Sequence, residues 1–241
     1  MKLLYASSIP IDAPPNKGGP NRWMFRESLK KYDIQGENFT LGCAFNHNGD
    51  DTWWRLLKAL EAQPSNEVVL VSDAWDVFFT TSLAVIERTF LEFDAPVVFA
   101  METNLFPPEI PRFGQIPEAP TRWRYINGGQ IIGYAGDLLN LFNTPDFWPR
   151  ELCWCNQEAY NRWWILHPDS KDFTLDFHCK LFCNLYDNHK MERPVLEAIE
   201  VCNIDGQRRL YNNETETFPC SFHGNGGWGP TAAKLWRMIS G

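Results

Sequence analysis

Two aspartates lie three residues apart in the segment 71–77, which reads VSDAWDV. The segment follows a continuous apolar run at 68–71, typical of a parallel strand buried on both faces, and open α/β sheets bind ligands at the carboxyl ends of such strands. Hard divalent ions such as Mg²⁺ and Mn²⁺ bind carboxylate and phosphate oxygens. This D-x-x-D pattern therefore predicts that Asp73 and Asp76 hold a metal ion, while Trp75 offers a flat face to a base. The alternative is that either aspartate caps a helix or lies in a solvated turn.

A glycine-rich segment, SFHGNGGWG, lies near the other end of the chain at 221–229. Glycines let backbone N–H groups approach phosphates closely, and the His223 imidazole can serve as a metal ligand. The segment therefore indicates a phosphate site with one further metal ligand, or else a flexible turn.

The elements that would position these residues alternate between strands and helices. Turn residues and apolar periodicity predict strands at 2–6, 39–45, 68–71 and 96–101 and helices at 22–31, 52–62 and 83–93. Farther along, we expect two short strands within 122–134, around an Asn-Gly-Gly sequence, and a short helix at 137–142. This alternation is typical of a nucleotide-binding α/β domain. Because the sequence shows no internal repeat or long linker, we expect one domain over 1–241.

The composition limits the partners and the compartment. A formal net charge of −8 means that a polyanion would have to meet a local basic patch. The apolar run at 1–6 is too short for a signal peptide or a membrane span, and seven scattered cysteines fit a reducing, cytoplasmic setting. A zinc cluster is an alternative use of some of them, although the spacing of Cys153, Cys155, His178, Cys179 and Cys183 matches no common tetrahedral pattern.

Several blocks together resemble the glycosyltransferase domain of the procollagen lysyl hydroxylase (PLOD) family. They are 55–60 (RLLKAL), 69–78 (VLVSDAWDVF), 97–102 (VVFAME), 124–134, 173–185 and 222–226 (FHGNG). In that family the amino-terminal domain has a GT-A fold and moves sugars from UDP-sugars. The resemblance implies an α/β, Rossmann-like nucleotide-sugar-binding fold with a central mixed, mainly parallel sheet flanked by helices.

The resemblance also implies roles for individual residues. The Mn²⁺ (or Mg²⁺) ligands would be Asp73, Asp76 and His223, and Trp75 would stack on uracil. The diphosphate would be contacted by Asn225 and Gly226. The donor-sugar side would be lined by Glu102, Asn127, Gly128 and Gly129.

Three positions depart from the family pattern. Where the family has an acidic pair before a glutamine facing the transferred sugar, residues 155–158 read CNQE, so Gln157 is present and the acidic pair is missing. The family's lysine after its HGNG block has its nearest counterpart in Lys234, beyond a short insertion. Phe106 stands where the family's gating loop has a tryptophan.

Transfer of a sugar needs the acceptor hydroxyl to be held near the anomeric carbon and its proton to be removed or shared. The sequence offers Glu102, Asp176 and Glu158 for this role, besides Gln157 on the sugar side. For Asp176 the alternative is a structural carboxylate that caps or pairs with a neighbour.

The prediction is therefore a metal-dependent hexosyltransferase that uses a UDP-sugar. The acceptor hydroxyl would belong to a protein, a glycan or a small molecule, or to a 5-hydroxymethylpyrimidine in DNA, reached by base flipping as in viral DNA modification; a viral enzyme of this kind would act in the host cytoplasm. Binding to DNA would require a local cluster of basic residues. The candidates are Arg112, Arg122, Arg124, Arg208, Arg209, Lys234 and Arg237. A non-catalytic nucleotide-sugar or carbohydrate-binding module and a metal-dependent phosphohydrolase remain as alternatives.

Overall fold

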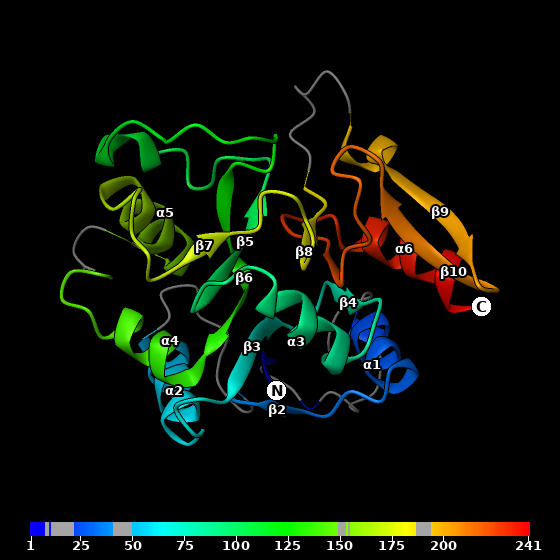
Figure 1. The fold of residues 1–241 in the computed structure, drawn as a ribbon, viewed down its shortest axis with the longest axis horizontal. Coiled ribbons are helices and arrows are strands. Elements are labelled where there is room, and N and C mark those ends of the chain that lie inside the picture. The colour runs from blue at the N-terminus through cyan, green and yellow to red at the C-terminus, as the bar shows by residue number, and fades with distance from the viewer. Residues whose placement is uncertain (8–9, 11–21, 41–49, 149–152, 154, 187–193) are drawn as a thin grey trace.

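The computed structural model describes residues 1–7, 10, 22–40, 50–148, 153, 155–186 and 194–241. A six-stranded sheet with strand order β2-β1-β3-β6-β5-β7 forms its centre (Figure 1). Its strands are β1 (Lys2–Ala6), β2 (Gly36–Asn38), β3 (Val68–Asp73), β5 (Val97–Glu102), β6 (Tyr125–Tyr134) and β7 (Thr174–Leu175). No helix among these residues is long and apolar enough to cross a bilayer.

One strand of this sheet runs against the others. β6 is antiparallel to both β3 and β5, whereas β1 pairs in parallel with β2 and β3, and β5 pairs in parallel with β7. The predicted mixed, mainly parallel sheet is therefore confirmed. The β3–β6 register ends with Ser72 opposite Gln130, so the next residues, Asp73 and Gly129, lie side by side at the carboxyl end of β3.

Helices cover both faces of the sheet. They are α1 (Arg22–Lys31), α2 (Asp50–Glu61), α3 (Leu83–Leu91), α4 (Ala135–Phe142), α5 (Asn156–Leu166) and α6 (Gly229–Ser240). Along β3, Val69 and Val71 enter one core with α2, α4, α5 and α6, whereas Val68 and Leu70 enter a second core with Phe25 of α1 and the buried face of α3. The alternation of strand side chains between two faces thus explains the continuous apolar run.

A second, three-stranded sheet joins distant parts of the chain. β11 (Ser221–His223) lies between β4 (Val77–Phe79), to which it is antiparallel, and β8 (Phe182–Asn184), to which it is parallel. The β9–β10 hairpin (Ile199–Ile204 and Gln207–Asn212) lies beside α6 at one end of the molecule (Figure 1). Two 3-10 helices, η2 (Ile110–Phe113) and η3 (Val195–Ala198), complete the described elements. Because β4 begins just after Asp76, its pairing with β11 brings His223 to the aspartates.

The structure corrects two of the expected elements. Residues 125–134 form one ten-residue strand, not two short ones, but its pairing with β5 is irregular where the interruption was expected. Phe99 pairs with Ile131 and Met101 with Ile126, so residues 127–130 of β6 bulge opposite a single residue of β5. The strand expected at 39–45 is also misplaced: β2 ends at Asn38, and Phe39 and Thr40 form a turn. Residues 41–45 lie outside the described part of the chain.

Candidate metal and donor site

Two aspartates and one histidine meet where β3, β4 and β11 come together. The Nε2 atom of His223 lies 3.2 Å from Oδ1 of Asp76 and 3.8 Å from Oδ2 of Asp73. Possible ligand atoms of the three residues lie within 4.8 Å of one another, and among the described residues this is the one such group of histidine, cysteine or acidic side chains. The His223 side chain is 3% exposed, whereas 45% of the Asp73 side chain is accessible, so an ion can reach the group from solvent.

The three residues shift one another's pKa values. Burial lowers the pKa of His223, but the carboxylates of Asp76, Asp73 and Glu102 outweigh this effect and raise the pKa above its usual value. Burial raises the pKa of Asp73, opposed by His223 and assisted by Asp76. Burial also acts to raise the pKa of Asp76, but the interaction with His223 outweighs this effect, so the pKa of Asp76 is lowered. Without a cation the group therefore holds protons that a divalent ion would displace.

The other ring nitrogen of His223 faces two asparagines. Its Nδ1 atom lies 2.8 Å from Oδ1 of Asn184 and 3.2 Å from Oδ1 of Asn127. The sequence did not identify Asn184, which is the register partner of His223 across the β8–β11 pair. The sequence signal that could have identified it is a polar residue at the end of an otherwise apolar strand.

Glu102 is the centre of a network of side-chain amides. Its carboxylate accepts hydrogen bonds from Asn127, Gln157 and Asn225, the last at 2.7 Å. The side chain is 2% exposed, and burial raises its pKa to about 7 while the three amides and His223 oppose the rise. The structure therefore brings three of the predicted site residues together around the carboxylate of a fourth, Glu102.

Two glycines of β6 make room beside this network. A Cβ atom on Gly129 would lie 2.4 Å from Cε1 of His223 and 2.7 Å from Oδ2 of Asp73. A Cβ atom on Gly128 would lie 3.0 Å from the side chains of Asn156 and Gln157. The N–H of Gly128 also donates to Oε1 of Gln157 at 2.9 Å. This hydrogen bond joins β6 to the first turn of α5.

The glycine-rich loop after β11 is anchored to both parts of the site. The N–H of Gly224 donates to the Asp76 carbonyl at 2.8 Å. The Asn225 side chain accepts from the Tyr186 N–H at 3.1 Å as well as donating to Glu102. Gly226 has φ of +61°, and a Cβ atom there would meet the Tyr186 ring at 2.1 Å, so only glycine fits this position.

Three other predicted contact residues have different surroundings. Trp75, which stands between the two aspartates in the sequence, is partly buried, and Phe106 is 43% exposed with its carbonyl 3.0 Å from the Gln157 side-chain nitrogen. Lys234 is exposed in the second turn of α6, which begins directly after the glycine-rich loop. The described contacts do not link Lys234 to the aspartates or His223.

Two of the predicted catalytic carboxylates are used elsewhere in the fold. Asp176 is fully buried and accepts backbone N–H groups of Lys180, Leu181 and Phe182 at 2.8–2.9 Å. Burial raises its pKa to about 6, and these N–H groups oppose the rise. The Glu158 side chain is also fully buried and pairs with Arg112 at 2.8 Å. Both arrangements favour structural roles, the alternative already noted for Asp176.

The basic residues fall in different parts of the fold. Arg112 and Arg122 are paired with Glu158 and Glu214, whereas Arg208 and Arg209 lie on β10 and Lys234 and Arg237 on α6, which packs beside β10. Several lie over aromatic rings, as Arg209 does over Phe218 at 4.7 Å.

A comparison with protein families finds that the PLOD GT domain matches residues 19–237. The chain belongs to this family. It is 28% identical to human procollagen-lysine,2-oxoglutarate 5-dioxygenase 2 over 240 residues, which are 91% of this chain and 30% of that protein. It is 30% identical to the bovine dioxygenase 1 over 75% of this chain and 23% of that protein. Uncharacterized protein R699 of Acanthamoeba polyphaga mimivirus is 26% identical over 77% of this chain and 36% of that protein. The PLOD-like chain thus spans roughly a quarter to a third of the length of these relatives.

Solved structures agree with this assignment at the level of the fold. A galactosyltransferase, LgtC, in complex with donor and acceptor sugar analogs superposes with a TM-score of 0.53 at 12% identity, covering 100% of this chain and 97% of that chain. A glycosyltransferase involved in the glycosylation of the major capsid of PBCV-1 gives a TM-score of 0.50 at 13% identity, covering 99% and 98%. The PLOD-like chain has the GT-A glycosyltransferase fold predicted from its sequence.

Proposed function

We propose that this PLOD-like domain, taken as one unit over 1–241, transfers a hexose from a UDP-sugar to an acceptor hydroxyl with the help of a divalent ion, Mn²⁺ or Mg²⁺. The observation that carries the proposal is the convergence of Asp73, Asp76 and His223 at a strand end of a GT-A fold. Two carboxylates and an imidazole suit a divalent ion and leave positions free for phosphate oxygens. Such an ion would neutralise the charge that develops on the diphosphate leaving group.

The residues of the chain then divide into a nucleotide side and a sugar side. Trp75 lies between the metal-binding aspartates, where its ring can stack on uracil. Backbone N–H groups of the loop at Gly226 and the start of α6 can receive the diphosphate, since helix N-termini favour anions. Lys234 would add a positive charge from the second turn of that helix. The Asn225 side chain already binds Glu102 and Tyr186, so its part is to hold the loop in place.

On the sugar side, Glu102 is the best placed group to act on the acceptor or the hexose. It is linked to the metal side through Asn127, whose Oδ1 faces His223, and to α5 through Gln157. A pKa near 7 lets its carboxyl group hold or accept a proton at neutral pH. Gly128 and Gly129 leave space for a hexose beside it. Asp176 and Glu158 are engaged by the fold and are the weaker candidates.

For the acceptor we favour a hydroxyl on a protein, a glycan or a small molecule. The whole-chain charge is −8, and Arg112 and Arg122 are paired with glutamates, which disfavours DNA carrying a 5-hydroxymethylpyrimidine. A GT-A neighbour is involved in glycosylation of a viral capsid, and one relative comes from a mimivirus, so a viral protein or its glycan is a reasonable acceptor to test. The free thiols of the described cysteines support action in a reducing compartment such as the cytoplasm.

Two alternatives make different predictions for the same site. Because Cys155 and Asn156 replace the family's acidic pair, a non-catalytic nucleotide-sugar or carbohydrate-binding module would bind donor without releasing UDP. A phosphohydrolase would release inorganic phosphate from the donor and leave sugar transfer undetected.

The test is to incubate the protein with Mn²⁺ and UDP-glucose, UDP-galactose or UDP-N-acetylglucosamine and to measure UDP, sugar and phosphate. We expect UDP release with at least one donor, and its loss in Asp76→Ala and His223→Ala but not in Asp169→Ala, an exposed aspartate outside the site. A hydroxylysine peptide, a glycan and hydroxymethylated DNA are then added to find the acceptor that stimulates release. Metal-dependent binding without release would point to the binding module, and free phosphate to the phosphohydrolase.

A further inference from the structure

The two nitrogen atoms of the buried His223 ring meet different chemical groups. Nε2 faces the carboxylates of Asp76 and Asp73, whereas Nδ1 faces two side-chain amides at 2.8 and 3.2 Å. A neutral imidazole carries its proton on one nitrogen and offers a lone pair on the other. The groups behind the ring therefore decide which nitrogen is available to a metal ion.

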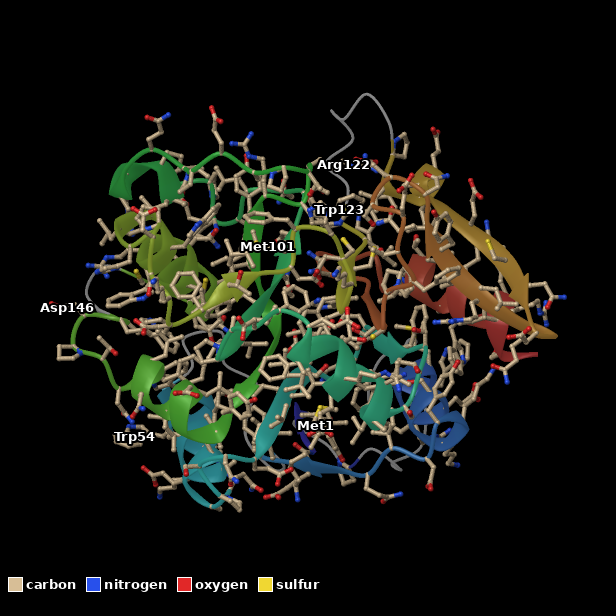
Figure 2. The ribbon with its side chains drawn as sticks, in the orientation of Figure 1. Met1, Trp54, Met101, Arg122, Trp123 and Asp146 are labelled. Carbon is tan, nitrogen blue, oxygen red and sulfur yellow. The ribbon has the colours of Figure 1, made fainter. Side chains whose placement is uncertain are left out.

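Both amides turn an oxygen toward the ring. The Asn184 side chain is fully buried, and its Nδ2 donates to the Met101 carbonyl at 2.8 Å, so Oδ1 is the atom that faces His223. Trp123 donates its indole N–H to the Asn184 carbonyl at 3.2 Å; Met101 and Trp123 are marked in Figure 2. Asn184 is thus held from several sides and cannot turn its amide without losing a buried hydrogen bond.

Asn127 has the same orientation for an independent reason. Its Oδ1 accepts the Gly129 N–H at 2.9 Å, and its Nδ2 points to Glu102. Among the residues that the structure describes, two oxygen acceptors and no donor therefore face Nδ1 of His223. An unprotonated Nδ1 would place its lone pair against two oxygens in a buried setting, so Nδ1 must carry a hydrogen.

We propose that Asn184 is a positioning residue that fixes His223 as the Nδ1–H tautomer and so presents the Nε2 lone pair to the metal ion. The inference rests on the proposed metal site and names a residue behind it. The shorter distance and the strand pairing of Asn184 with His223 make it the main acceptor, with Asn127 as the second. Asn184 is separated from the ion by the imidazole ring, so its removal should weaken metal binding without removing a ligand.

The experiment measures the affinity of the full chain for Mn²⁺ from the electron paramagnetic resonance signal of free hexaaqua Mn²⁺. Asn184→Leu removes the acceptor at similar volume, and Asn184→Asp keeps an oxygen toward Nδ1. The matched control is Asn212→Leu, because Asn212 is equally buried but lies in β10 and bonds to the turn at 214–215. His223→Ala is included to test the metal site itself. Thermal unfolding in EDTA establishes which variants are folded.

We expect Asn184→Leu to bind Mn²⁺ about 10- to 100-fold more weakly, the range found for partners of metal-bound histidines. Asn184→Asp keeps the oxygen toward Nδ1 but gives up the hydrogen bond to the Met101 carbonyl, so it should lose less affinity than Asn184→Leu, and Asn212→Leu should leave the affinity unchanged. If Asn184→Leu binds Mn²⁺ normally while His223→Ala does not, the inference is overturned and the metal site stands. If His223→Ala binds as tightly as the unmodified protein, the metal site itself is wrong.

If Asn184→Leu does not fold, a second measurement tests the tautomer of His223 directly. The unmodified protein, labelled with ¹⁵N at its five histidines, is loaded with Mg²⁺ and UDP, and the His223 resonances are assigned from their loss in His223→Gln. A proton on Nδ1 and none on Nε2 is the expected tautomer. A proton on Nε2 would overturn the inference.

Discussion

Glu102 and Asp176 are both buried carboxylates at ends of neighbouring strands, yet they are held in opposite ways. Glu102, at the end of β5, is bound by three side-chain amides that come from β6, α5 and the loop after β11. Asp176, after β7, is bound by three backbone N–H groups of the turn that follows it. Burial raises the pKa of both, to about 7 and about 6.

A raised pKa therefore does not by itself distinguish a catalytic carboxylate from a structural one. Around Asp176 every partner is local backbone, so the carboxylate shapes the chain between β7 and β8. Around Glu102 the partners are side chains of elements far apart in sequence, and one of them, Asn127, also faces His223. A carboxylate on which distant elements converge is the better candidate for chemistry.

Replacing Glu102 should have the largest effect on activity. We expect Glu102→Gln to lower the rate of UDP-sugar turnover by about 10³-fold, about 4 kcal/mol, because a positioned acid or base is lost. The free energy of unfolding should fall by about 1 kcal/mol only, because the amide keeps the volume and one acceptor oxygen and leaves one of the three buried amide donors without its partner. Steady-state UDP release measures the rate and thermal unfolding measures the stability. A normal rate in Glu102→Gln would show that Glu102, like Asp176, is not needed for turnover.

Asp176→Ala should act on stability instead. It leaves three buried N–H groups without their acceptor, so we expect the free energy of unfolding to fall by about 3 kcal/mol, while turnover per folded molecule stays the same. Denaturant unfolding measures the loss, with Asp172→Ala as the control, an exposed aspartate nearby. A folded Asp176→Ala protein with no activity would place Asp176 in the mechanism.

Gly129→Ala should weaken metal binding because the added Cβ atom would overlap His223 and Asp73. Overpacking of this kind costs about 2 kcal/mol, or about 30-fold in Mn²⁺ affinity. Gly133→Ala is the matched control in the same strand, where a Cβ atom would crowd the Pro96 carbonyl at 2.7 Å instead. Equal Mn²⁺ affinities for the two variants would contradict the placement of β6 against the metal ligands.

Acid should weaken metal binding by a smaller amount. The pKa values of His223 and Asp73 are both raised, so protons compete with the ion at a higher pH than for free side chains. Affinity should therefore fall as the pH drops from 7 to 6, by about tenfold, the effect of one displaced proton. Isothermal titration at the two pH values checks this, and an affinity that does not fall on acidification would contradict the proposed ligands.

The sequence predicted one half of the site better than the other. The D-x-x-D pattern follows a strand end, so local reasoning found Asp73 and Asp76, but only the family resemblance joined them to His223. Asn184 was missed because its role depends on the β8–β11 pairing, which no local pattern reveals. The two glycines made β6 look interrupted; the strand continues through them, but its pairing with β5 skips residues 127–130, and the glycines make room for the metal ligands.

The metal–diphosphate site is tested most directly by titrating UDP into the protein by calorimetry, with and without Mn²⁺. UDP should bind in the presence of Mn²⁺, and chelation, Asp76→Ala or His223→Ala should remove binding. UDP binding of equal strength with and without the ion, or Mn²⁺-dependent binding that survives both substitutions, would show that Asp73, Asp76 and His223 are not the metal–diphosphate site.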